Sequence, residues 1–309
     1  MERWILAAVW ATLPLTAGGA LGDAVAHWPN APAVVAAVVV WTVWAIGLLA
    51  IAVPRPVGLT VLRVVAPDLV VAAVVVLVAS DAPLGGAVVA LVATLVAAVL
   101  VARPALARTC LGAVAYGDEE RFPLRVPTLL YLGPLPAVRL LVGAAVVAGP
   151  LLLADGRWVL GAACVVVGGV VVWLGGRALH GLSGRFVVLV PAGFVIVDPL
   201  TLADPVLFLR ERIVGLRAVS GAPPPGALDL RLGATAGTVE LALTGEAEVF
   251  RATRGRRGAS TVRAATLLVA VPDRALVLRR AGERRIPMTE TSVTATQTAT
   301  PPPSSTSPS

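Results

Sequence analysis

The sequence predicts an α-helical membrane bundle of about six spans, followed by a small cytosolic β-rich domain that resembles a barrel or sandwich with a C-terminal helix. Of the 309 residues, 57% are hydrophobic and 14% are charged, whereas soluble domains carry about 25% charged residues. Long apolar runs fill residues 1–176. After Leu174 the pattern changes to short segments in which apolar and polar residues alternate, as in half-buried strands.

Six runs are long enough to cross the hydrocarbon, which takes roughly 20 helical residues for about 30 Å. The first run is diluted by Pro14 and two glycines, so a signal peptide with Arg3 before its apolar core is an alternative there. Either reading leaves the later topology unchanged. We expect a transmembrane domain at residues 1–176, with spans at 4–21, 33–53, 64–80, 84–102, 135–154 and 158–174 and a cytoplasmic loop at 103–134.

The distribution of arginine predicts the orientation in the membrane. Arginine is concentrated in every second loop, whereas residues 22–32 and 81–83 carry none and residues 155–157 carry one. The positive-inside rule assigns the arginine-rich loops to the cytoplasm. We therefore expect a multi-pass protein of the plasma membrane with both termini in the cytoplasm. The arginines concerned are Arg55 and Arg63; Arg103, Arg108, Arg121 and Arg125; and Arg177 and Arg185.

The net charge of +7 belongs to the C-terminal domain. Residues 1–176 carry nine arginines and eight acids, which leaves +1, and residues 177–286 carry 16 arginines and nine acids, which leaves +7. Glu290 brings the total back to +7. The remaining segment, 287–309, is rich in Thr, Ser and Pro and lacks apolar mass, so we expect it to be disordered.

Residues 177–286 are predicted to form about seven strands and one helix. Two strands flank Pro191 and Ala192, which suit a hairpin turn. Pro272 and Asp273 then open a helix to about Arg285, because proline and an acid both suit a helix N-terminus. The expected strands are 185–190, 193–198, 206–209, 213–219, 228–232, 239–243 and 261–271.

Two ionisable residues lie within or at the edge of the spans. Asp68 is a candidate ion or proton site, since acids in a membrane are costly and often functional. The alternative is that its carboxylate reaches the cytoplasmic interface and is satisfied there by water or Arg63. Arg139 lies about one turn into the fifth span, where a long side chain is expected to extend to the surface.

The loop between the fourth and fifth spans is unlike its bland surroundings. Three adjacent acids are followed there by arginine, an aromatic residue and proline. We consider a docking surface for the C-terminal domain or a ligand, and the alternative of a solvated loop whose arginines reach lipid headgroups. The candidate docking residues are Asp118, Glu119, Glu120, Arg121, Phe122 and Arg125.

A second candidate site is the basic loop formed by Arg251, Arg254, Arg256 and Arg257. On a domain tethered to the cytoplasmic leaflet, such a loop is suited to anionic lipid, at about 1 kcal/mol per arginine near the surface. The alternative is a loop that serves solubility alone. Nucleic acid is not an expected partner, because no stacking aromatic residues accompany the arginines.

No catalytic, cofactor-binding or metal-binding set is visible in the sequence. The two cysteines, Cys110 and Cys164, and the two histidines, His27 and His180, are far apart in the chain and have no zinc-type spacing. There is also no nucleophile–base pair and no phosphate-binding glycine loop. We therefore expect no cofactor and no enzymatic activity.

Two stretches carry a resemblance to known proteins. They are YGDEERFPLR at 116–125, continuing to GPLP at 133–136, and RFVVLVPAGFVIVDPLTLADPVLFLRERI at 185–213. These stretches resemble an uncharacterised family of actinobacterial polytopic membrane proteins, and the resemblance spans most of the chain except the tail. It implies the topology and no chemistry. More loosely, the order of hairpin, further strands and final helix is similar to bacterial pleckstrin-homology-like (PH-like) domains, which lack a common catalytic set.

These observations favour a membrane-anchored interaction or regulatory protein that presents a PH-like domain to anionic lipid headgroups or to a cytosolic protein. The alternative is a small-solute transporter with a cytosolic regulatory domain, which requires Asp68 to face a water-filled cavity between helices. A third possibility is an enzyme acting on lipid, which requires the acids at 118–120 to meet other polar groups at the headgroup level.

Overall fold

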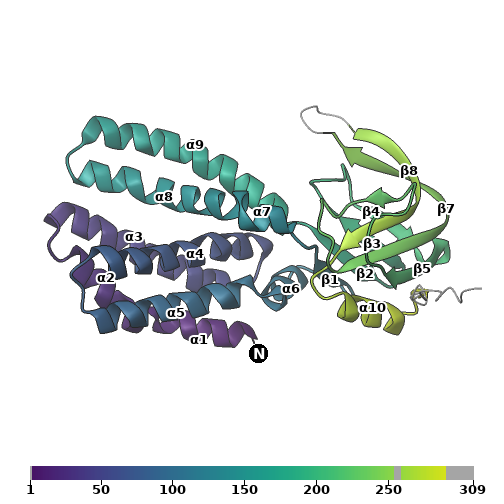
Figure 1. Cartoon of the computed structure of the whole chain (residues 1–309), viewed down its shortest axis with the longest axis horizontal. Helices are drawn as coiled ribbons and strands as arrows, with labels where there is room; N and C mark the ends of the chain where they lie inside the picture. Colours follow the sequence, from purple (N-terminus) through teal and green to yellow (C-terminus); the bar gives the residue numbers. More distant parts are fainter. Residues whose placement is uncertain (1, 254–258, 290–309) are drawn as a thin grey trace, which may run out of the picture.

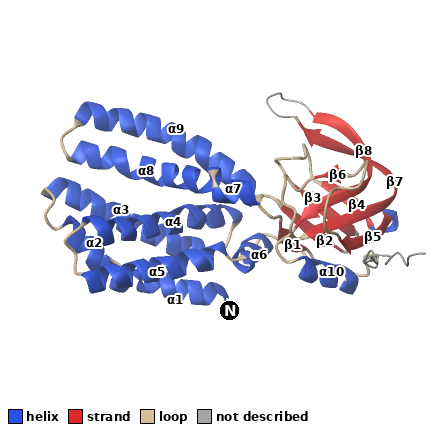
Figure 2. Ribbon diagram, in the orientation of Figure 1, coloured by secondary structure: helices blue, strands red, loops and turns tan. Residues whose placement is uncertain are grey.

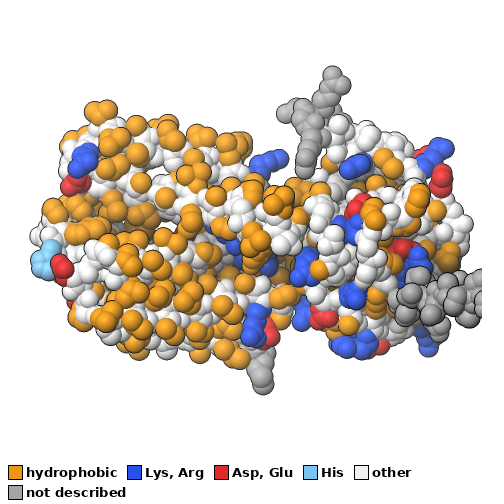
Figure 3. All heavy atoms as spheres, in the orientation of Figure 1, with side chains coloured by type: hydrophobic (Ala, Val, Ile, Leu, Met, Phe, Trp, Pro, Cys, Tyr) orange, Lys and Arg blue, Asp and Glu red, His pale blue; other side chains and the backbone are white. Residues whose placement is uncertain are grey.

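The computed structural model describes residues 2–253 and 259–289. A helical part (α1 to α9) and a β-rich part (β1 to β8 with α10) lie end to end along the long axis of the molecule (Figure 1 and Figure 2). Six helical segments are long and apolar enough to cross a membrane. Apolar side chains cover most of the helical surface seen in Figure 3, and charged side chains lie mainly toward its ends and on the β-rich part. These features indicate a multi-pass membrane protein.

The helices agree closely with the six expected spans. The first span is divided at Ala17, three residues after Pro14, into α1 and α2. The sixth continues beyond Leu174 to Ser183, since Gly175 and Gly176 do not interrupt its hydrogen bonding. The sequence analysis did not identify α6 and α7, two short helices in the loop between spans. The bounds are α1 Glu2–Thr16, α2 Gly18–Val25, α3 Asn30–Ala52, α4 Pro56–Ala79, α5 Leu84–Ala102, α6 Pro104–Gly112, α7 Thr128–Leu132, α8 Pro134–Ala154 and α9 Trp158–Ser183.

A reciprocal pair of tryptophans joins α1 to α3. Trp10 donates its indole N–H to the carbonyl of Trp44, and Trp44 donates to the carbonyl of Trp10, both at 3.0 Å. Trp10 is fully buried, and its ring occupies the space beside Gly47, where a Cβ would overlap it. A buried indole needs a hydrogen-bond acceptor, so this pair fixes the two helices at one relative height.

Glycines bring α8 and α9 into close contact. A Cβ added to Gly168 would lie 2.8 Å from the carbonyl oxygen of Ala145, and one added to Gly161 would lie 2.8 Å from the amide nitrogen of Leu153. Small residues allow such approach between membrane helices, where packing supplies much of the association energy. The α8–α9 pair therefore depends on these positions.

Replacing Gly168 with Ala should force α8 and α9 apart and lower stability by about 1–3 kcal/mol, the usual cost of overpacking. Thermal unfolding of the detergent-solubilised protein measures the effect. Gly169→Ala is the matched control, because a Cβ there meets no atom within 4 Å. The control should be neutral or slightly stabilising, since alanine is favoured over glycine in a helix by up to about 1 kcal/mol. Equal midpoints for the two variants would contradict the close packing.

The β-rich part contains two four-stranded sheets. One has the order β1-β2-β3-β4 and is antiparallel throughout, and the other has the order β5-β7-β8-β6, in which β6 pairs in parallel with β8. The helix α10, Arg274–Glu283, follows the last strand. The strand bounds are β1 Glu120–Pro123, β2 Phe186–Val190, β3 Gly193–Val197, β4 Val206–Leu209, β5 Ile213–Ala218, β6 Leu228–Asp229, β7 Thr238–Ala252 and β8 Ala259–Ala270.

Two of the expected strands differ in length from those observed. The segment predicted at 228–232 pairs only at Leu228 and Asp229, because Leu232 adopts a φ of 55° and the side chain of Arg231 turns back to Asp229. The segment predicted at 239–243 extends to Ala252, since β7 continues beyond an irregularity to pair with the first half of β8.

The strand β1 comes from the loop between two spans and completes the first sheet. Glu120 lies opposite Leu189 and Pro123 lies opposite Phe186, in an antiparallel register. The helices α7, α8 and α9 are therefore inserted between two neighbouring strands of one sheet. The sequence analysis did not predict this strand, because four residues with two charges and a proline show no alternation and the partner strand follows two spans later.

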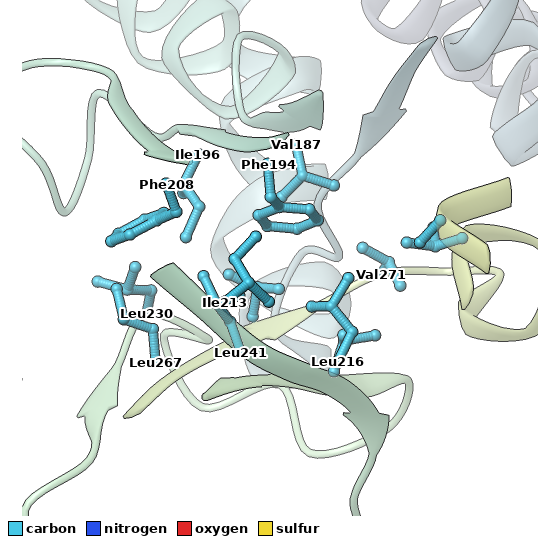
Figure 4. Close-up of a cluster of buried hydrophobic side chains, with 14 of the residues drawn as sticks. Val187, Phe194, Ile196, Phe208, Ile213, Leu216, Leu230, Leu241, Leu267 and Val271 are labelled. Atoms are coloured by element: carbon cyan, nitrogen blue, oxygen red, sulfur yellow. The ribbon is translucent and has the colours of Figure 1, made fainter. Parts of the chain in front are cut away.

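The core of the β-rich part lies between its two sheets (Figure 4). Phe194, Ile196 and Phe208 of the first sheet face Leu216 and Leu241 of the second. Phe122 of β1 and the following Leu124 belong to the same core and are 5% and 6% exposed. The helix α10 adds Val277 and Ala281, and the Asp273 side chain caps its first turn by accepting from Leu276 N–H at 3.1 Å. The core thus draws on residues from both sides of the α8–α9 pair.

The end of β1 lies next to the start of β2, because Pro123 is opposite Phe186. A short Gly/Ser linker can therefore replace residues 127–183. The resulting protein, in which residues 116–126 are joined to residues 184–289, should be soluble. We expect it to unfold cooperatively and at a higher temperature than residues 184–289 alone, which lack Phe122 and Leu124 in the core. Burying two such side chains contributes about 1.5–3 kcal/mol each. Circular dichroism during heating compares the two. The strand insertion would be contradicted if both fragments melted together.

Candidate functional site

The helical and β-rich parts meet at one end of the helical part, which we call the junction end. It contains the starts of α4 and α8 and the ends of α5 and α9 (Figure 1). Arg108 of α6 donates to Asp273, the cap of α10, at 3.2 Å. Beside this ion pair, α6 packs on β1 and on Val277 of α10 around a small crevice. The β-rich part is therefore held against the membrane helices by contacts with α6.

A fully buried ion pair lies directly after α9. Arg185 Nε and Nη2 donate to the two carboxylate oxygens of Asp198, each at 2.8 Å. The side chains are 1% and 0% exposed. Asp198 also accepts the Leu200 N–H at 3.1 Å. Two parallel charge-assisted bonds are the strongest geometry for such a pair.

The remaining donors of Arg185 connect three segments of the chain. Its guanidinium donates to the carbonyl of Arg125, in the loop after β1, at 3.3 Å and to that of Leu230 at 3.1 Å. The same loop is bound through its backbone, since Leu124 N–H donates to Arg185 and Arg125 N–H donates to Ala270, at 3.0 and 2.7 Å. The buried pair therefore ties the loop before α8 to the residue that follows α9.

Removing one partner of this pair, as in Asp198→Asn or Arg185→Met, should lower the free energy of unfolding by about 3–5 kcal/mol, because the other charge is left buried without compensation. The double variant Arg185→Met/Asp198→Leu should recover part of the loss. Chemical or thermal unfolding of the soluble linker protein provides the measurement. As a control, Arg263→Gln removes an exposed pair with Glu248, which should change stability by less than about 1 kcal/mol. A similar loss in both single variants and the control would refute this role.

The structure places the candidate docking loop, residues 118–125, against the β-rich part. Arg121 forms an ion pair with Glu119 at 3.0 Å, and its guanidinium lies 5.3 Å from the ring centre of Phe186. The hydrogen bond from Arg121 lowers the pKa of the Glu119 carboxyl. Phe122 is in the core, and Arg125 lies beside the end of β8. Although this loop lies between two spans in the sequence, it belongs to the β-rich part in the fold.

A hollow of about 390 Å³ lies where this loop meets α10. Its charged lining is balanced between acids and arginines, and many of these groups already have partners. Arg280 lies 3.5 Å from Glu120 and 2.8 Å from Glu283, and Arg284 donates to the carbonyl of Asp118. The hollow is therefore bounded by contacts between the loop and α10, although Glu120 Oε2 is buried there without a hydrogen-bond partner among the described residues. Its lining is Asp118, Glu120, Pro191, Arg210, Arg280, Glu283 and Arg284.

Of the predicted lipid-binding arginines, only Arg251 lies within the described residues, and Arg254, Arg256 and Arg257 lie outside them. Arg251 is exposed near the end of β7 and pairs through its backbone with Ser260 of β8. The end of β7 and the start of β8 lie on the side of the β-rich part opposite α10 (Figure 1). They are therefore separate from the hollow described above.

Asp68 and Arg139 lie at the contact between α4 and α8. A Cβ at Gly143 of α8 would overlap the Asp68 carboxylate, so this carboxylate fills the space beside the glycine. The Nε of Arg139 is buried without a hydrogen-bond partner among the described residues. Arg63, which the sequence analysis considered as a cytoplasmic loop arginine and as a partner for Asp68, is close to Arg139. The structure thus brings three ionisable side chains together at the junction end.

Within the described residues, no group of three or more His, Cys, Asp or Glu side chains is placed to hold a metal ion. Cys110 and Cys164 are both free thiols. Burial raises the pKa of the Cys110 thiol, which disfavours the reactive thiolate.

No protein-family model, curated protein or solved structure matches the chain. The arrangement of its own residues is therefore the basis for a function.

The sequence analysis missed the ion pair of Arg185 with Asp198 and the proximity of Arg63 to Arg139. The signal for the first was available, because the two residues flank the predicted β2–β3 hairpin and an antiparallel hairpin brings its outer ends together. The signal for the second was absent, since the contact between α4 and α8 does not follow from hydropathy.

Proposed function

We propose that this protein is a membrane-anchored regulatory or interaction protein that presents a PH-like domain at the cytoplasmic leaflet of the plasma membrane. The observation that carries the proposal is the position of β1, which is both a loop between spans and an edge strand of the β-rich part. A ligand that shifts the first sheet acts directly on the segment that leads into α8. Such a connection suits a domain whose binding state is transmitted to the membrane helices.

The arrangement of strands supports the comparison with PH-like domains. A four-stranded antiparallel sheet is followed by a second sheet, whose antiparallel strands β5, β7 and β8 pack across the core, and by a C-terminal helix. The insertion of α7 to α9 between β1 and β2 departs from a simple domain that follows the last span. We attribute this departure to anchoring, because the chain then connects the domain to the helices at three points. These are the passages from α6 to β1, from β1 to α7 and from α9 to β2.

The arginine distribution supports the proposed orientation. The described arginines of the interhelical loops lie mainly at the junction end, and Arg157, at the α8–α9 turn, is at the other end. Under the positive-inside rule the junction end and both termini are then cytoplasmic. The β-rich part would face the anionic headgroups of that leaflet, to which exposed arginines such as Arg251 are attracted.

The position of Asp68 favours this function over a transporter. A transporter that uses Asp68 requires the carboxylate to face a water-filled cavity between helices, and it instead fills the space beside Gly143. The lipid-directed enzyme is also less well supported. The acids of the loop meet Arg121, Arg280 and the backbone of a neighbouring strand, which are the contacts of a structural interface.

The proposal can be tested by hydrogen–deuterium exchange on the full-length protein in nanodiscs of phosphatidylcholine, with and without phosphatidylglycerol. We expect anionic lipid to protect the end of β7 and the start of β8 from exchange. Added salt should reverse this protection, because salt screens the attraction between exposed charges. Changing Arg251, Arg254, Arg256 and Arg257 to Gln should abolish the difference. Arg157→Gln, at the opposite end, is the control. Identical exchange in both lipids at low salt would exclude lipid as the ligand and direct attention to a protein partner.

A further inference from the structure

Arg63 and Arg139 are brought to the same level of the bundle by the packing of α4 and α8. Their neighbours in the sequence, Val64 and Val138, belong to one apolar cluster. One turn deeper, Asp68 of α4 lies against Gly143 of α8. The two helices therefore run side by side from the junction end, and Arg63 of α4 and Arg139 of α8 lie at the same level of their contact.

Neither arginine takes part in an ion pair within the described part of the chain. Asp68 is the acid in range of Arg139, and it lies beyond ion-pair distance. The Nε of Arg139 is also buried without a hydrogen-bond partner among the residues that the structure describes. Charged groups at membrane depth are costly unless compensated, so two such arginines favour the binding of an anion.

Other polar side chains surround the two arginines. Tyr131 of α7 lies near both of them. On the same face of α4 as Arg63, Thr60 Oγ1 donates to the carbonyl of Pro56 at 3.1 Å and lies 3.4 Å from His180 Nδ1 of α9. Hydroxyl and imidazole groups can donate hydrogen bonds to phosphate oxygens. Helices α4, α7, α8 and α9 therefore all contribute polar side chains to the junction end.

The depth of this region matches a lipid headgroup. Arg139 is five residues after Pro134, which places it about 7–8 Å along α8 at 1.5 Å per residue. An arginine at that depth extends its charged end toward the interface. Arginine side chains also gather at the boundary between the helical and β-rich parts in Figure 3.

We propose that Arg63 and Arg139 form a binding site for the phosphate of an anionic lipid headgroup, inserted between α4 and α8 at the junction end. The guanidinium groups bind the phosphate oxygens, and Tyr131 and the Thr60–His180 pair lie along the edge of the site. The bound anion compensates the charge of both arginines and joins α4 to α8. This site lies within the helical part, so it is independent of whether the β-rich part binds lipid.

The site is tested on full-length protein, purified in a neutral detergent and stripped of lipid. Dioleoyl phosphatidylglycerol, dioleoyl phosphatidylcholine and inorganic phosphate are titrated separately while the unfolding temperature is recorded. We expect saturable stabilisation by phosphatidylglycerol and little by the other two. Equal stabilisation by inorganic phosphate would overturn the lipid as the source and assign the site to a free anion. Equal stabilisation by the two lipids would overturn the site itself.

Variants locate the binding. Arg63→Gln and Arg139→Gln should each weaken binding of phosphatidylglycerol about tenfold, as expected for a lost charge-assisted contact. Arg103→Gln is the matched control, since Arg103 lies at the same end but is exposed and pairs with Glu2. It should keep the affinity of the parent. Changing Arg251, Arg254, Arg256 and Arg257 should also leave this binding intact, which separates the site from that of the β-rich part.

A Gln variant that fails to fold is replaced by the Lys variant, Arg63→Lys or Arg139→Lys. Lysine keeps the charge but cannot bind two oxygens in a fork, so we expect weaker binding with a folded protein. Native mass spectrometry of the unstripped protein gives an independent measure, as retained phosphatidylglycerol should fall in the variants. Parental affinity and retention in every folded variant would overturn the proposal.

Discussion

The structure depends on one buried ion pair, between Arg185 and Asp198. A guanidinium with no access to water requires acceptors for its donors, and the carboxylate and two backbone carbonyls provide them. One of these carbonyls belongs to the loop after β1 and the other to the segment after β6. The requirement for acceptors therefore fixes where three distant segments meet, at the point where α9 leaves the membrane. A single apolar residue at position 185 would fill the space without specifying those partners.

The pair also explains how a sheet can be interrupted by two membrane helices. Between β1 and β2 the chain leaves the β-rich part, forms α7 and the α8–α9 pair, and returns. The register of β1 is fixed at its end by Leu124 and Arg185, and close glycine contacts hold α8 to α9. The inserted helices thus behave as a long, stiff connection inside a β-hairpin. Under the proposed function, a movement of α8 and α9 against the rest of the bundle would reach the edge strand β1.

Local patterns in the sequence predicted most elements, and long-range contacts account for what was missed. Hydropathy located six spans, and alternation and turn residues located the β2–β3 hairpin and β4, because these depend on neighbours in the chain. The strand β1 was not predicted, since the order in Glu120–Pro123 comes from pairing with β2 across two spans. Asp68 and Arg139 were recognised as unusual from their setting, but Arg63 acquires its importance only through the contact of α4 with α8.

The chain satisfies its arginines in different ways, and the differences bear on function. Arg185 is enclosed and fully bonded, as expected of a group that specifies structure. Arg121, Arg280 and Arg284 each bind an acid or a backbone carbonyl of the β-rich part. Arg63 and Arg139 differ from both groups, because they are partly enclosed, lie at the same level of the contact between α4 and α8 and form no ion pair among the described residues. Because uncompensated charges are costly in a protein interior, the proposed lipid phosphate would stabilise this arrangement, and at this depth the phosphate layer of the membrane is the nearest source of anions.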